Sequence, residues 1–205
     1  NLEKYFEVEG LSYHLAPVKA SPQAGRRAGE VNTDRMYHLL MHEFKWGNIE
    51  DPDVYLNQDN RRMLNNMRSQ FARLAVALFN EGKQDSAKKV MDFALEKISN
   101  DVLAYGYFSL PFIRTYYKIN EKEQARKHLN ILLENITQEM DYYVGLKTLS
   151  VQFPDEIKRS MYSLRTLSDI AGKYGDSDLS QSILQHFDRY MKFLQQNQQL
   201  IKSFR

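Results

Sequence analysis

Two histidines, His38 and His42, stand four residues apart, a spacing that suits metal chemistry. On a helix this spacing places two imidazoles on one face, where both can reach the same ion. In a zinc protease helix, the residue after the first histidine is the glutamate that acts as base, but here that residue is Leu39. No third ligand is evident in the sequence. We therefore interpret the pair as surface or half-buried histidines and predict no metal site.

A run of acidic and amide residues between positions 51 and 59 superficially suggests calcium binding. A helix-loop-helix calcium loop needs an oxygen ligand at its fifth position, glycine at its sixth and glutamate at its twelfth. The corresponding residues here are Tyr55, Leu56 and Arg62. The acids are better interpreted as turn formers and helix caps.

The sequence also lacks the residues that other kinds of catalytic site require. There are no cysteines, which excludes thiolate nucleophiles, thiolate metal sites and disulfides. Neither a glycine-rich phosphate loop nor a serine, histidine and acid set emerges from the sequence order. The run 135–137 is formally a glycosylation sequon, which matters only in a eukaryotic secretory setting. We predict no catalytic residue and no cofactor for these residues.

The composition is that of an ordinary globular protein, with 205 residues of which 26% are charged and 42% hydrophobic. A net charge of +2 is far below the basic excess of phosphate-binding surfaces, so we expect no nucleic-acid partner. The longest apolar runs are much shorter than the roughly 20 residues that span a bilayer. Because the chain starts at Asn1 without a signal-peptide pattern, we interpret it as a fragment of a longer protein.

Helical hairpins are the elements that would position any binding residue. The first hairpin surrounds Gly82 with apolar and small residues at helical spacing: Phe71, Leu74, Ala75, Leu78, Ala87, Met91, Ala94 and Leu95. This spacing resembles a tetratricopeptide repeat. A weaker second copy runs from 109 to 133, where Asn120 takes the place of Gly82. Its period is 38 residues, compared with the usual value of about 34.

The sequence therefore predicts a mainly α fold, in which tetratricopeptide-like antiparallel hairpins stack as a short solenoid. Residues 1–58 would form an irregular segment with one short strand and one helix. Residues 59–136 would hold the two hairpins. Residues 137–205 would be helices that cap the solenoid.

Local signals predict the boundaries of several of these elements. Alternation at Leu11, Tyr13 and Leu15 favours a short half-buried strand, and the run 21–29 has loop composition. A helix should start at Asn32 or Thr33 and stop at Gly47, and Thr137 is a predicted helix cap. Gly175 and Ser180 suggest a third, degraded hairpin, whose last helix would run to about Lys202.

In a tetratricopeptide hairpin the first helix lines the concave surface, and this resemblance points to seven partner-binding residues. They are Arg73, Val76 and Asn80 in the first copy, and Tyr107, Arg114, Tyr117 and Lys118 in the second. Tyrosine and arginine are enriched at interface hot spots. We expect the partner to be a protein or a peptide.

Segments before and within the first hairpin carry a second resemblance. They are YFEVEGLSYHLAPV at 5–18, NTDRMY at 32–37, FKWGN at 44–48 and NRRM at 60–63. These runs look like the soluble C-terminal region of large Bacteroidetes membrane proteins, whose multi-pass part is similar to protein O-mannosyltransferases of the GT-C class. The likeness covers about residues 5–145. It implies a tail on the periplasmic face of the cytoplasmic membrane, with the catalytic carboxylate and the lipid-linked sugar site in the missing membrane part.

Three functional hypotheses follow. The tail is a non-catalytic module that binds or positions a protein, which could be its own membrane domain. Alternatively, it contributes acceptor-specificity residues to the glycosyl-transfer site, or it is a purely structural cap. The fragment would contact a membrane only through the missing N-terminal part.

Overall fold

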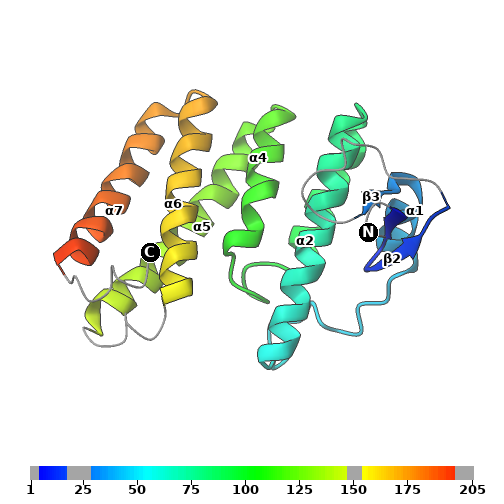
Figure 1. Ribbon diagram of the computed structural model, residues 1–205, viewed down its shortest axis with the longest axis horizontal. Coiled ribbons are helices and arrows are strands. Elements are labelled where there is room, and N and C mark those ends of the chain that lie inside the picture. Colours follow the sequence, from blue (N-terminus) through cyan, green and yellow to red (C-terminus); the bar gives the residue numbers. More distant parts are fainter. Residues whose placement is uncertain (1–4, 18–28, 147–153, 197–205) are drawn as a thin grey trace. The chain divides into compact units, whose positions relative to one another are not determined.

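In a computed structural model of the protein, residues 5–17, 29–146 and 154–196 are described. Helix predominates in these ranges, which contain seven α-helices and a small N-terminal sheet (Figure 1). The predicted mainly α class is confirmed. Contacts divide the chain into two compact units, one ending at Leu103 and the other starting at Ala104. The predicted loop at 21–28 and the predicted helix end beyond 196 lie outside the described residues.

The first unit opens with a three-stranded sheet of order β2-β1-β3. Strand β1 (Phe6–Glu9) pairs antiparallel with β2 (Ser12–Leu15) and parallel with β3 (Glu30–Val31). The predicted strand is thus β2, but its expected half-burial is wrong, because all four of its side chains are exposed. As an edge strand, β2 leaves the core contact to Val8 of β1, which is fully buried.

Helix α1 (Thr33–His38) begins where the sequence predicts, because the Asn32 side chain accepts a hydrogen bond from the Arg35 backbone N–H at 3.1 Å. It continues as a π-helical turn, Leu39–Glu43, and does not reach Gly47 as predicted. The Phe44 N–H donates to the Leu39 carbonyl at 3.0 Å, an i to i+5 bond that widens the last turn. The backbone at Phe44 is then extended, which ends the helix.

The first helical hairpin consists of α2 (Gln58–Asn80) and α3 (Gln84–Lys97). Asn57 caps α2 by accepting a hydrogen bond from the Asn60 N–H at 2.8 Å. The predicted small residues Ala75 and Ala87 are both fully buried, as the hairpin interpretation requires. Arg68 is also fully buried and donates from Nη2 to the Ile98 and Leu103 carbonyls, at 3.0 and 2.7 Å.

The second unit contains a 3₁₀ turn (Tyr107–Ser109) and helices α4 (Leu110–Lys118), α5 (Lys122–Gly145), α6 (Pro154–Lys173) and α7 (Ser177–Gln196). Pro111 lies in the first turn of α4, where its missing N–H is tolerated. The predicted helix start at Thr137 is wrong, because α5 runs through it. Its hydroxyl donates to the Glu134 carbonyl at 2.9 Å. This bond satisfies the hydroxyl within the helix, although threonine is also a common helix cap.

The turns of all three hairpins share one backbone geometry. The second residue after each first helix is left-handed, with φ of +78° at Gly82, +66° at Asn120 and +87° at Gly175. In each turn the next backbone N–H donates to the carbonyl five residues earlier, at 2.9 Å in every case. This is the Schellman arrangement, which satisfies carbonyls at a helix end. Gly175 therefore ends the first helix of a third hairpin, α6 and α7.

Candidate functional site

Two exposed tyrosines from different helical segments are in contact in the second unit. Tyr107 lies in the 3₁₀ turn before α4 and is 39% exposed, whereas Tyr162 lies in α6 and is 56% exposed. Their ring centroids are 5.7 Å apart. Large aromatic side chains that remain exposed while in contact with each other are typical of binding surfaces.

A second aromatic contact fixes how α4 and α6 run. Tyr117, in α4, stacks on Tyr174, just after α6, with ring centroids 5.0 Å apart and an interplanar angle of 10°. From the first contact to the second, both chain segments proceed toward their C-terminal ends: one from Tyr107 to Tyr117, and the other from Tyr162 to Tyr174. Helices α4 and α6 therefore run in the same direction. They are the first helices of successive hairpins and are in contact with each other.

Exposed basic residues lie on the same helical segments as the two tyrosines. Arg114 and Lys118 lie one helical turn apart on one side of α4, and Tyr107 lies in the 3₁₀ turn before that helix. Arg159 and Arg165 lie one turn before and one turn after Tyr162 on α6. All of these side chains are exposed. We call six residues the α4–α6 surface: Tyr107, Arg114, Lys118, Arg159, Tyr162 and Arg165.

Tyr117, predicted to contact a partner, faces the interior of the unit. Only 3% of it is exposed, and its hydroxyl donates to Asp176 Oδ2 at 2.5 Å. Burial, and then the hydrogen bond to Asp176, raise the pKa of Tyr117 well above its ordinary value. Arg126 Nε also lies 3.7 Å from Asp176. The structure thus separates Tyr117 from Tyr107, Arg114 and Lys118, which it does bring to the α4–α6 surface.

The three partner-binding residues predicted in the first hairpin lie in different structural environments. Arg73 donates from Nη2 to the Gly29 carbonyl at 3.0 Å, and its Nη1 lies 3.4 Å from the Tyr13 hydroxyl. It therefore holds the N-terminal segment against α2. Val76 is half-buried and Asn80 is exposed. Beside Arg73, the exposed ring of Tyr13 contacts the half-buried ring of Phe6, with centroids 5.7 Å apart.

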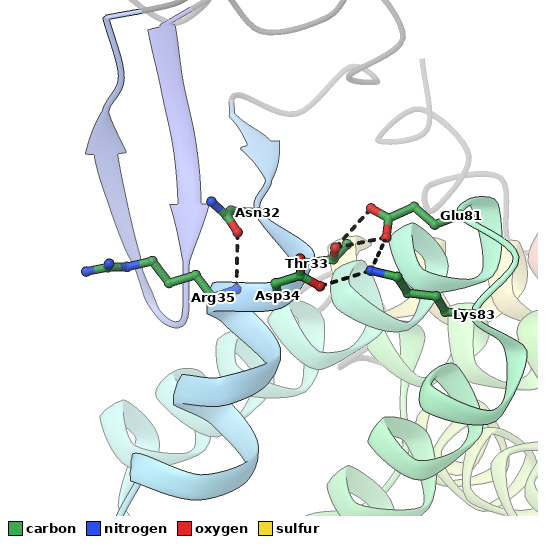
Figure 2. A network of polar contacts seen from close by, with 6 residues as sticks. All are labelled: Asn32, Thr33, Asp34, Arg35, Glu81 and Lys83. Carbon is green, nitrogen blue, oxygen red and sulfur yellow. Dashed lines mark hydrogen bonds and ion pairs between the residues drawn. The ribbon is translucent and has the colours of Figure 1, made fainter.

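A polar network in the first unit ties α1 to the turn between α2 and α3 (Figure 2). The Thr33 hydroxyl donates to Glu81, with Oε1 and Oε2 at 3.0 and 2.9 Å. Lys83 Nζ lies 2.9 Å from both Asp34 and Glu81. The hydrogen bonds to Glu81 and then Asp34 raise the pKa of Lys83. Each of these acids is matched by a donor, so we interpret the network as structural.

The other candidates from the sequence also take structural roles. His38 and His42 are exposed, and His38 Nε2 lies 3.2 Å from Glu43. Within the described ranges, no three His, Asp or Glu residues are placed to hold a metal ion. Asp51 accepts a hydrogen bond from the Asp53 N–H at 3.0 Å, which confirms it as a turn former. Asn135, of the sequon, lies within α5 and donates to the Tyr105 carbonyl at 3.1 Å.

Sequence reasoning missed the α6 half of the α4–α6 surface. Arg159, Tyr162 and Arg165 recur every three residues within a predicted helix, and this spacing was the available signal. The repeat pattern of the third hairpin is too weak in the sequence to predict which side of its first helix would be concave.

Comparisons with known proteins identify no relative. No family model matches this chain, and neither a curated protein nor a solved structure matches it. None of the described helices is long and apolar enough to cross a bilayer.

Proposed function

We propose that this chain is a non-catalytic protein-binding module built from tetratricopeptide-like hairpins, and that the α4–α6 surface receives the partner. The contact between Tyr107 and Tyr162 carries this proposal. It joins α6 to the turn that leads into α4, and α4 and α6 are the first helices of two successive hairpins. First helices line the binding surface of a helical-repeat solenoid.

The residue types on this surface suit a peptide partner. A tyrosine ring supplies a large contact area, and it loses little conformational entropy because it has only two side-chain torsions. An arginine adds directional donors for backbone carbonyls or carboxylates. Tyr107, Tyr162 and Arg114 are all of the residue types that dominate interface energies.

We further propose a setting for the module, as the periplasmic tail of a membrane glycosyltransferase. The sequence resemblance over about residues 5–145 supports this setting. In it, the tail would hold an acceptor polypeptide near the membrane domain. A native protein of only 205 residues, measured by intact mass, would overturn this setting without affecting the binding proposal.

A random peptide library tests the binding proposal directly. The full chain is immobilised, peptides are selected on it, and each is then measured against the double variant Tyr107→Ala, Tyr162→Ala. We expect selected peptides to bind the variant roughly tenfold more weakly, as the loss of a hot spot predicts. The control is Tyr142→Ala, which removes a ring that is 62% exposed on α5.

The two outcomes separate the hypotheses. Peptides that lose affinity for the double variant and keep it for the Tyr142 control support the module. If no selected peptide distinguishes the double variant from the unmodified chain, the binding proposal fails and the structural-cap hypothesis gains.

A further inference from the structure

The α4–α6 surface carries an excess of positive charge. Four of its six residues are basic, and Lys173 extends the series at the end of α6. Two exposed acids, Asp155 and Asp169, lie on the side of α6 that carries these basic residues. The chain as a whole carries a net charge of only +2, so this local excess of positive charge is not a reflection of the bulk composition.

Intramolecular ion pairs leave the charges of Arg114, Arg159 and, in part, Arg165 available to a ligand. Arg165 Nε lies 3.5 Å from Asp169, but their side chains are 59% and 63% exposed, so solvent screens the pair. Within the described residues, neither Arg114 nor Arg159 forms an ion pair. Two other arginines of the same unit, Arg126 and Arg189, each lie beside an aspartate. The arginines without such a neighbour thus flank the exposed tyrosines.

We propose that the α4–α6 surface binds an acidic, extended peptide segment of a partner polypeptide. This inference rests on the proposed function and names the chemistry of its ligand. Guanidinium groups bind carboxylates with two parallel hydrogen bonds, so Arg114 and Arg159 would each hold an acidic side chain. The tyrosine rings would pack against the peptide backbone and the aliphatic parts of the acidic side chains.

The length of the surface sets the length of the segment. Arg159 and Lys173 are separated by about 21 Å along α6, at roughly 1.5 Å per helical residue. An extended peptide advances about 3.3 Å per residue, so about six residues cover that distance. Side chains alternate along an extended peptide, so acids at every second position would all face the surface.

Two matched synthetic peptides test the inference on the full chain. One alternates glutamate with leucine over eight residues and carries a fluorescent label, and the other replaces each glutamate with glutamine. We expect the acidic peptide to bind at least tenfold more tightly by fluorescence anisotropy. Its affinity should fall as salt is raised, because the exposed charges are then screened.

Charge-matched variants identify the surface. The double variant Arg114→Ala, Arg159→Ala should weaken binding of the acidic peptide roughly tenfold. The control, Lys122→Ala with Lys127→Ala, removes two exposed charges from α5 and should change affinity less than twofold. Circular dichroism checks that both variants remain folded. An equal loss in the control would overturn the inference.

Three further outcomes would also overturn it. If the glutamine peptide binds as tightly as the acidic one and still depends on Tyr107 and Tyr162, the surface binds peptides without selecting acids. The proposed function then stands while this inference fails. If vesicles rich in anionic lipid bind through Arg114 and Arg159 while the acidic peptide does not, the ligand is a membrane surface. If neither peptide binds and no library peptide distinguishes the tyrosine variant, both proposals fail.

Discussion

The Tyr117 hydroxyl donates a hydrogen bond to Asp176 Oδ2 at 2.5 Å, which joins α4 to the turn between α6 and α7. Asp176 follows the left-handed Gly175, so the bond is made to the turn itself and not to a helix face. The stacked ring of Tyr174 lies against the same tyrosine. Tyr117 thus connects two successive hairpins of the second unit, and this connection can be measured.

Replacing Tyr117 by Phe should destabilise the second unit. The variant keeps the stacked ring but removes the donor, which leaves the largely buried Asp176 carboxylate without it. We expect the free energy of unfolding to fall by about 1.5–3 kcal/mol, the usual value for a hydrogen bond to a charged group. Urea unfolding followed by circular dichroism measures it. The control Tyr107→Phe removes an exposed hydroxyl and should change stability by less than about 0.5 kcal/mol. Equal effects in the two variants would contradict the connection.

Arg68 should be the most important polar residue of the first unit. Its guanidinium satisfies the carbonyl of Ile98, at the end of α3, and that of Leu103. Arg68→Met fills similar space but leaves two carbonyls without this donor, so we expect a loss of about 2–4 kcal/mol. Trp46 is the single tryptophan and stacks on Phe71, so its fluorescence reports unfolding of this unit.

The matched control for this prediction is Arg62→Met, at a side chain of α2 that is 75% exposed. It should change the midpoint of the same fluorescence transition very little. A loss of less than about 1 kcal/mol for Arg68→Met would show that water replaces the guanidinium at both carbonyls.

The three hairpin turns should respond differently to the same substitution. Gly82 and Gly175 have positive φ, and a Cβ at either position would meet no atom within 4 Å, so any cost of alanine there comes from the backbone. We expect Gly82→Ala and Gly175→Ala each to cost about 1 kcal/mol or more. Asn120→Gly should instead be neutral or slightly stabilising, since glycine adopts the same left-handed conformation at less steric cost than asparagine. Thermal unfolding of the three variants gives the comparison, and a destabilised Asn120→Gly would contradict it.

Tyr190 should make the second unit sensitive to alkali. Its hydroxyl lies 2.9 Å from Asp141 Oδ1 and 3.1 Å from the Thr137 carbonyl. Burial, and then the bond to Asp141, raise the pKa of Tyr190 from 10.0 to about 12. Because the folded pKa is the higher one, this stabilisation is complete below about pH 10 and is lost as the pH rises through about 12.

The measurement is urea unfolding at a series of pH values between about 9 and 11.5, compared with Tyr190→Phe. The unmodified protein should lose more stability across this range than the variant does, since the phenylalanine cannot ionise. Tyr143 has its pKa raised to about 12 by burial and by Glu139, and it remains in both proteins as an internal reference. Parallel pH curves for the two proteins would contradict the role of Tyr190.

The hairpins could be predicted from sequence because their signals are local. Gly82, Asn120 and Gly175 mark left-handed turns, since few residue types adopt that conformation. Apolar spacing around them identified helices α2, α3 and α4 and most of α6 and α7. Thr137 misled the prediction because threonine can either cap a helix or bond back to a carbonyl within one, and the choice depends on what the next turn packs against.

Only the tertiary structure decided which side chains face outward. Helical spacing shows that Arg114 and Lys118 share a side of α4. It does not show that the neighbouring Tyr117, also predicted to bind a partner, is buried. Whether a side is covered depends on elements far away in the chain, here Asp176 and Tyr174 for Tyr117 and the N-terminal segment for Arg73. The same dependence explains Tyr162. Its exposure beside Tyr107 arises from the packing of α6 on α4, which no local pattern encodes.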